Sequence, residues 1–404
     1  MLKEGYEAVL AYSALRWTMM GGTESGGNAR YYVGFNYPHE EMRKKGTFVP
    51  YLGRDSIVFI PREGKPAFLA RARKARAALD AVNIIKEQSW MDDVRPVYGI
   101  FPKDNFQVFA EMVKDLFGER DLKPEGKIGV GGINTPMELW IELNHLFPKA
   151  SIHNITDDLG RLRMVKSENE LKLMRAAAKI NNAALSTMIE VCRPGVAEWE
   201  VHQAMEATMF KHGADNVWNI VHSGPRSWAR GSLPDFTQRT LKEGDMISCD
   251  YGCEYSGYHS DTNYALIIGE GRREQKDILK LIIKMMDAML SITREGVTDT
   301  ELVLVAMESA KGTPYEKYVW TNFGHSYGCG GEIPSLDVEV QPHKTREQQI
   351  EIKANMLFCY EPAVYVPNIG GACLEDEIIV TTDGYEVLTY NTYEAKRALG
   401  LSFT

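Results

Sequence analysis

Several features that mark other classes of protein are missing from this sequence of 404 residues. No stretch approaches the ~20 consecutive apolar residues that a membrane-spanning helix needs. The longest unbroken basic run is Arg43-Lys44-Lys45 and the formal net charge is -9, so the basic surface of a nucleic-acid-binding protein is also missing. The six cysteines show no CxxC spacing, which argues against a zinc knuckle or a disulfide framework.

The beginning of the chain also lacks the pattern of a secretory signal, which is positive charge followed by an apolar run. The segment Met1–Glu7 contains two acids instead. Cysteines in a reducing compartment are expected to be buried free thiols. We therefore expect a cytoplasmic protein with no membrane and no nucleic-acid partner.

What the sequence does contain is enough apolar material for more than one core. Hydrophobic residues make up 44% of the chain, and its length exceeds the roughly 250–300 residues at which a single core stops growing. Residues 1–162 alternate apolar strands with amphipathic helices. Asp55–Pro61 and Pro66–Ala70 have the pattern of a hairpin, Lys127–Gly131 that of a strand, and Met137–Leu146 that of a helix. This pattern predicts an α/β domain.

A second domain is expected over residues 163–404. Ser167 and Glu170 form a capping box at the start of a helix that should run towards Cys192. From Asn216 onward short β-type runs dominate, interrupted by a helical pattern over Glu274–Thr293. The fold class expected for the whole chain is α/β, with α+β character in its second half.

Acidic residues stand repeatedly within or beside these apolar strands, where an unpaired carboxylate is costly. Asp250 ends one run, Asp261 opens the next strand eleven positions later, Glu361 closes a third, and Glu375 precedes a fourth. His325 lies in a glycine-containing segment that permits close backbone approach. Four carboxylates and one imidazole suit divalent Mn, Fe, Co or Zn, and bridging carboxylates suit two such ions.

The order of these residues resembles the pita-bread metallopeptidase family, which includes methionine aminopeptidase, aminopeptidase P, prolidase and creatinase. The motifs that carry the resemblance are Asp250, Gly257-Tyr258-His259-Ser260-Asp261, Gly324-His325-Ser326-Tyr327-Gly328, Glu361-Pro362, Glu375-Asp376 and, near the N-terminus, Ala29-Arg30-Tyr31-Tyr32-Val33-Gly34-Phe35. The resemblance implies a creatinase-like N-terminal domain over 1–162 and a catalytic pita-bread domain over 163–404. It also implies two metal ions held by Asp250, Asp261, His325, Glu361 and Glu375, and a homodimer.

Two histidines of the family's peptidases are missing. One should follow the Ser-Gly loop, but Pro225-Arg226-Ser227-Trp228 stands there. The other should lie about seven positions after the metal-binding histidine, where this chain has Glu332. The metal-binding residues are kept while the residues that bind and protonate a peptide differ, so peptide cleavage is not assured by the resemblance.

Replacement groups can be proposed, each with a plainer alternative. Glu361, Glu332 and His259 are the candidate catalytic residues; Glu332 is otherwise a solvated loop acid, and His259 a histidine on a surface strand. His222, Arg226 and Trp228 are candidate substrate-binding residues, because Arg offers a bidentate fork and Trp a face that binds cations. The alternatives are a structural histidine and a solvated loop.

The expected activity is that of a metallohydrolase of the Xaa-Pro aminopeptidase or dipeptidase type, acting through water activated by two metals, with a dipeptide or another small molecule as substrate. One alternative is a non-peptide member of the same fold, either a creatinase-like C–N hydrolase or a dimethylsulfoniopropionate-type lyase that acts on a small zwitterionic acid. Another alternative is a non-catalytic binding protein, which the intact ligand set argues against.

Overall fold

The computed structural model describes residues 4–17, 23–25, 55–72, 90–98, 102–132, 135–229 and 234–402. The chain divides into two compact units, Met1–Thr18 with Thr23–Arg163, and Met19–Gly22 with Met164–Thr404. The Arg-Tyr-containing motif at 29–35 lies outside the described residues. Within them, no helix is long and apolar enough to cross a membrane.

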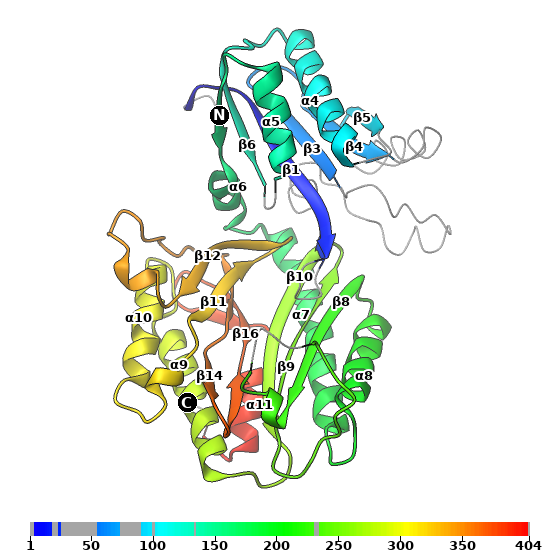
Figure 1. The fold of residues 1–404 in the computed structure, drawn as a ribbon. Helices are drawn as coiled ribbons and strands as arrows, with labels where there is room; N and C mark the ends of the chain where they lie inside the picture. The colour runs from blue at the N-terminus through cyan, green and yellow to red at the C-terminus, as the bar shows by residue number, and fades with distance from the viewer. Residues whose placement is uncertain are drawn as a thin grey trace. The chain divides into compact units, whose positions relative to one another are not determined.

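The first unit is a mixed sheet with helices on both faces (Figure 1). Its strands follow the order β5-β4-β3-β1-β6-β7, with β2 paired to β1. The strands are β1 (Tyr6–Trp17), β2 (Thr23–Ser25), β3 (Asp55–Pro61), β4 (Ala67–Ala72), β5 (Asp93–Tyr98), β6 (Lys127–Gly131) and β7 (Ser151–Asn154). The helices are α4 (Pro102–Glu119), α5 (Met137–Leu146) and α6 (Thr156–Arg163).

Alternation along β1 explains how this sheet is covered. Leu10 and Tyr12 belong to the core that contains residues of α4 and α5. Val9 and Ala11 belong to the core on the other face, which contains Leu159 of α6. Because successive side chains of a strand point to opposite faces, one apolar strand supplies both cores. The expected hairpin, strand and helix of this region are confirmed as β3–β4, β6 and α5.

The second unit contains three sheets. Their strand orders are β10-β9-β8, β12-β11-β13-β16-β17 and β14-β15. The strands are β8 (Asn216–Ser223), β9 (Met246–Tyr255), β10 (Tyr258–Ile267), β11 (Asn322–Tyr327), β12 (Gly331–Asp337), β13 (Leu357–Tyr360), β14 (Ala363–Val366), β15 (Gly370–Cys373), β16 (Asp376–Val380) and β17 (Tyr385–Val387). The helices are α7 (Glu168–Val191), α8 (Glu198–Lys211), α9 (Arg273–Ile292), α10 (Asp299–Ala310) and α11 (Asn391–Ala398), with short 3₁₀ turns at Gly224–Arg226, Glu316–Tyr318 and Gln341–His343.

Helices α7 and α10 begin directly after capping residues. The Ser167 hydroxyl oxygen accepts a hydrogen bond from the backbone N–H of Glu170, and the Glu170 carboxylate accepts one from the backbone N–H of Ser167, as the sequence predicts. The helical pattern expected over Glu274–Thr293 is α9, displaced by one residue. Helix α10 has a capping box of its own at Thr298 and Glu301, which the sequence interpretation did not use.

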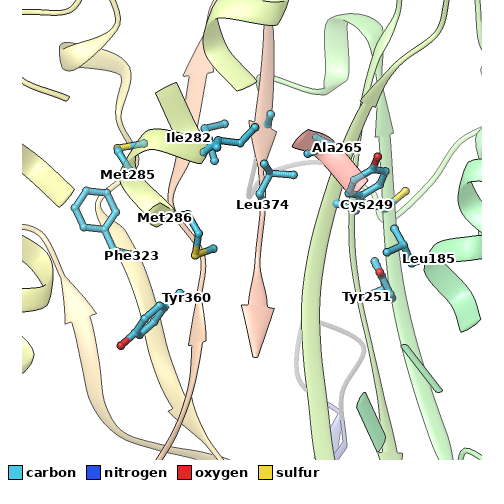
Figure 2. Close-up of a cluster of buried hydrophobic side chains, with 14 of the residues drawn as sticks. Leu185, Cys249, Tyr251, Ala265, Ile282, Met285, Met286, Phe323, Tyr360 and Leu374 are labelled. Carbon is cyan, nitrogen blue, oxygen red and sulfur yellow. The ribbon is translucent and has the colours of Figure 1, made fainter. Parts of the chain in front are cut away.

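One apolar core joins the sheets and helices of this unit (Figure 2). It includes Cys249 and Tyr251 of β9, Met286 of α9, Tyr360 of β13, and Leu374 between β15 and β16. Each of Cys249, Tyr251, Tyr360 and Leu374 is a neighbour in sequence of one of the candidate ligands. The expected fold class, α/β with an α+β second half, is confirmed by this architecture and by the structural comparisons below.

Candidate metal centre

Two aspartates, Asp250 of β9 and Asp261 of β10, lie on the same face of the hairpin that these strands form. Cys249 and Tyr251 are in the core, so the alternation of a strand directs Asp250 to the opposite face. Asp250 stands opposite Asn263 in the antiparallel register, and Asp261 precedes Asn263 by two positions. Both aspartates therefore leave the hairpin on the face that is turned away from the helices α7 and α8.

Strand β10 begins three residues earlier than the sequence interpretation assumed, so Asp261 lies within the strand and does not open it. The reason is a tight turn at Ser256 and Gly257, whose φ angles are +48° and +85°. A two-residue turn with positive φ at both positions matches the right-handed twist of paired strands. Pairing consequently continues through Tyr255 and Tyr258.

Three of the five predicted ligands converge in space. Ligand atoms of Asp261, His325 and Glu375 all lie within 4.8 Å of one another. His325 Nε2 is 3.7 Å from Asp261 Oδ2 and 4.0 Å from Glu375 Oε1. These distances are too long for direct hydrogen bonds and suit two ligands of one ion, each bound at roughly 2.0–2.2 Å. Two carboxylates and an imidazole are a donor set that fits a divalent transition metal.

The other two predicted ligands lie on elements that flank this group. Asp250 is on β9, which pairs with β10, and Glu361 follows β13, which pairs with β11. Both side chains are buried. The Glu361 backbone is fixed, because its N–H donates to Phe323 O at 2.9 Å and its carbonyl accepts from Cys373 Sγ at 3.5 Å.

The close pairing of β11 with β13 requires a glycine, Gly324, immediately before His325. Its φ is +142°, and a Cβ built there would overlap Cys359 O on the paired strand β13. Only glycine allows β11 to approach β13 this closely. The close pairing places His325 opposite Cys359, next to the residues that lead to Glu361.

Glu332, the candidate that occupies the place of a missing histidine, is engaged in a buried ion pair. Its Oε2 lies 2.6 Å from Lys166 Nζ, and both side chains are 1% exposed. Lys166 Nζ also donates to Met164 O at 3.1 Å and to Ser326 Oγ at 3.4 Å. A Cβ on Gly328 would overlap the Glu332 carboxylate. Glu332 is thus not a solvated loop acid, because its carboxylate is buried and paired with Lys166.

His259 is buried on the same face of β10 as Asp261, so it is not on an exposed strand. Its cross-strand partner is Glu254, and the distance from His259 Nε2 to Glu254 Oε2 is 3.9 Å. The ring centroid lies 5.2 Å from that of Tyr327 and 6.2 Å from that of Trp218. The Tyr327 ring in turn packs edge to face against His325, with a centroid distance of 5.3 Å, so one aromatic ring lies between His259 and His325, the candidate metal-binding histidine.

The three candidate substrate-binding residues are held by the loop that follows β8. His222 Nε2 lies 3.1 Å from Pro234 O, and Arg226 Nη2 donates to the same carbonyl at 2.6 Å. Arg226 Nε is also 3.3 Å from Oε2 of Glu198, a fully buried acid. Trp228 lines a pocket of about 240 Å³. Arg230, two positions after Trp228, lies outside the described residues.

Burial raises the pKa of several groups around the centre. Burial raises the pKa of the Tyr327 hydroxyl well above its usual range, and the neighbouring carboxylate of Asp261 adds to the effect. Burial also raises the pKa of Glu377 to about 8, although its carboxylate accepts a hydrogen bond from the N–H of Asp261 at 2.8 Å. The Tyr327 hydroxyl is therefore neutral at physiological pH.

Sequence reasoning missed four residues of this region: Lys166, Glu254, Tyr327 and Glu377. The rule that an acid in an apolar strand needs a partner applied to Glu377, which precedes Ile378-Ile379-Val380. Lys166 and Glu254 had no comparable local signal, because their partners are distant in sequence or across a hairpin.

The carboxylates of Asp261 and Glu375 converge with the imidazole of His325 in this unit, and such a donor set fits the divalent metal of a metallohydrolase. The comparisons with known proteins agree, because the model of metallopeptidase family M24 matches residues 172–382. The chain belongs to metallopeptidase family M24, as its resemblance to the pita-bread enzymes predicts.

The similar proteins share most of their length with this chain. An Xaa-Pro dipeptidase of Pyrococcus horikoshii is 28% identical over 292 residues, which are 71% of this chain and 78% of that protein. Among solved structures, an X-Pro aminopeptidase from Thermotoga maritima gives a TM-score of 0.75 at 23% identity and covers 96% of this chain and 94% of its own. A prolidase from Pyrococcus horikoshii gives 0.74 at 23% identity, with 96% and 95% covered. The two structures establish the fold.

Proposed function

We propose that this protein is a metal-dependent hydrolase of the Xaa-Pro dipeptidase or aminopeptidase type. Its centre would hold two divalent ions through Asp250, Asp261, His325, Glu361 and Glu375, with residues 163–404 as the catalytic domain and 1–162 as a creatinase-like domain. The observation that carries the proposal is the convergence of Asp261, His325 and Glu375 within 4.8 Å. Membership of family M24 and the names of the similar proteins support the reaction class.

The chain's own groups suit amide hydrolysis. When bound, divalent ions at such a centre lower the pKa of water and polarise a carbonyl oxygen. Glu361 follows a buried strand, and its backbone is held at both its N–H and its carbonyl. Its carboxylate would move a proton from water to the leaving nitrogen. His259 lies next to Tyr327, whose ring also contacts His325, and His259 would contact the substrate from the β10 side.

A second candidate is a non-peptide member of the fold, acting on a small zwitterionic acid by C–N hydrolysis or by elimination. The ion pair between Glu332 and Lys166 favours it. Glu332 stands where the family's peptidases are expected to have a histidine, and its carboxylate is paired with Lys166 in place of a neutral donor. An oxyanion donor is worth roughly 10²–10³ in rate, so Xaa-Pro turnover is expected to fall to the low end of the ordinary range of about 1–10³ s⁻¹ or below it.

The deciding experiment is a parallel substrate screen. Protein reconstituted with Mn²⁺, Co²⁺, Fe²⁺ or Zn²⁺ is assayed against Xaa-Pro dipeptides, creatine-like amidines, and sulfonium or betaine acids. Asp261→Asn should abolish turnover, whereas Asp277→Asn, on the partly exposed face of α9, should leave it unchanged. Turnover of an Xaa-Pro dipeptide supports the proposal. Turnover of a small acid alone replaces it with the second candidate, and activity that survives Asp261→Asn overturns both.

Quaternary structure is a separate part of the proposal. We expect a homodimer, as in the resemblance described above, and light scattering at micromolar concentration measures it directly. A monomer at that concentration would contradict the expectation without bearing on the metal centre.

A further inference from the structure

Asn391, the first residue of α11, joins β10, which carries Asp261, to the segment before β16, which carries Glu375. Its side chain is fully buried. The amide Nδ2 donates to Asn263 O and to Glu375 O, each at 3.0 Å, and Oδ1 accepts from the hydroxyl of Tyr251 at 3.3 Å. Both protons of the amide are used, and the contact with Tyr251 fixes which end of the amide faces the two carbonyls.

The two carbonyls belong to the backbone of the proposed centre. Asn263 stands opposite Asp250 and two positions after Asp261. Its carbonyl also accepts the N–H of Glu375 at 2.8 Å. Since Asn391 binds the carbonyl of Asn263 and that of Glu375 at once, it holds the β10 backbone beside Asp261 at a set separation from Glu375.

Asp376 anchors this end of the chain to the same place. Its Oδ1 accepts from Asn391 N–H at 2.8 Å and from Thr389 Oγ1 at 2.9 Å, and its Oδ2 accepts from Thr392 N–H at 2.9 Å. Thr389 Oγ1 in turn accepts the N–H of Glu377 at 2.9 Å. Asp376, which follows Glu375, therefore binds the first residues of α11. Asn391, the first of these, binds the carbonyl of Glu375 in return.

We propose that Asn391 is a positioning residue of the metal centre and that the segment Thr389–Ala398 is thermodynamically linked to metal occupancy. The inference rests on the function proposed above, since it presumes a divalent ion between Asp261 and Glu375. Removing a group that hydrogen-bonds to a metal ligand and orients it typically lowers metal affinity 10–100-fold. Linkage is reciprocal, so an ion that needs the ordered segment also stabilises that segment.

Asn182 of α7 provides a matched control. Its Nδ2 donates to Leu388 O at 2.9 Å, and its Oδ1 accepts from Tyr390 N–H at 3.1 Å. These two hydrogen bonds hold the same end of the chain, yet neither involves β10 or Glu375. Removing Asn182 deletes these two hydrogen bonds, while the bonds of Asn391 to the ligand backbone and of Asp376 to the start of α11 remain and keep the folded segment ordered. The comparison therefore separates positioning from general stability.

The experiment is calorimetric titration of Mn²⁺ into the full chain as wild type, Asn391→Ala, Asn391→Ser and Asn182→Ala, at a temperature where each is folded. Asn391→Ala should weaken Mn²⁺ binding about 10–100-fold, and Asn391→Ser, which keeps one donor, should weaken it less. Asn182→Ala should bind within about threefold of wild type although its melting temperature also falls. Hydrogen exchange should show that Mn²⁺ protects Thr389–Ala398 in the wild type and fails to do so in Asn391→Ala.

The outcomes are separable. Wild-type affinity in Asn391→Ala, or equal weakening in Asn391→Ala and Asn182→Ala, overturns the positioning role. If Asn391→Ala does not fold, the comparison of Asn391→Ser with Asn182→Ala decides by the same criterion. Because the titration uses Mn²⁺ without substrate, a protein that binds Mn²⁺ with the expected pattern and turns over no Xaa-Pro dipeptide would contradict the proposed function and leave this inference standing.

Discussion

The buried ion pair between Lys166 and Glu332 gives the sharpest test of this structure. The pair is 1% exposed on each side and spans 2.6 Å from Nζ to Oε2. The ammonium has three protons and three acceptors in reach: Glu332, Met164 O and Ser326 Oγ. Every donor of Lys166 is therefore used, and the pair has the hydrogen-bonded geometry that a buried charge requires.

Replacing one partner of the pair should lower the free energy of unfolding far more than replacing both. Glu332→Gln or Lys166→Met leaves an uncompensated buried charge, which costs about 3–5 kcal/mol. At about 2–4 °C per kcal/mol for a unit of this size, the melting temperature should fall by roughly 6–20 °C. The double variant Lys166→Met/Glu332→Gln leaves no charge buried, so it should recover most of that loss.

The assay is urea unfolding of the wild type, both single variants and the double variant, read as a double-mutant cycle. Glu308→Gln is the control, because its pair with Lys311 is largely exposed, with side chains 73% and 66% accessible, and such pairs contribute little. A loss below about 1 kcal/mol in Glu332→Gln, or a double variant no more stable than the weaker single variant, would refute the reasoning.

The same variants decide whether Glu332 has a catalytic role. As a structural partner, Glu332→Gln should lower kcat no more than Lys166→Met does under conditions where both are folded. A tenfold or larger loss of kcat in folded Glu332→Gln that Lys166→Met does not share would restore Glu332 as a catalytic residue.

Three further outcomes are expected. Asp261→Ala should abolish activity and also remove the stabilisation by metal, which is about 2.7 kcal/mol at a concentration of 100 Kd; a melting temperature that still rises with Mn²⁺ would contradict this. Gly328→Ala should lower the free energy of unfolding, because its Cβ overlaps the Glu332 carboxylate that Lys166 holds, and an unchanged urea midpoint would show that the carboxylate can move. Burial raises the pKa of the Cys192 thiol to about 12, whereas a thiol in the unfolded chain ionises near pH 8.5. Between these pH values the unfolded state loses the proton while the folded state retains it, so the free energy of unfolding should fall by about 1.4 kcal/mol per pH unit above pH 9. Urea titrations at pH 9 and 10 should show a smaller fall in Cys192→Ala.

Local signals were sufficient for much of the fold. The capping box at Ser167 and the apolar periods of α5 and α9 depend on neighbours within one or two helical turns, and the hairpin of β3 and β4 depends on a short turn. The ends of β10 were harder to predict, because the turn at Ser256 and Gly257 carries no Asn-Gly or Asp-Gly signature.

The candidate metal ligands could be predicted from the sequence because of their chemistry. Acids placed in apolar strands need partners, and the spacing of Asp250, Asp261, His325, Glu361 and Glu375 matches a known family. The convergence of Asp261, His325 and Glu375 is what the structure adds to that pattern.

The sequence by itself determined the class of elements, the residue types of the candidate metal centre and the family, because each of these depends on local periodicity or on a motif read in order. Only the tertiary structure showed the contacts of Glu332 and Asn391. Lys166 lies 166 positions from Glu332, and Asn391 lies 128 positions from the Asn263 carbonyl that it binds. Partners so far apart leave no periodic trace in the chain, since the pairing of strands and the docking of α11 alone bring them within hydrogen-bonding distance.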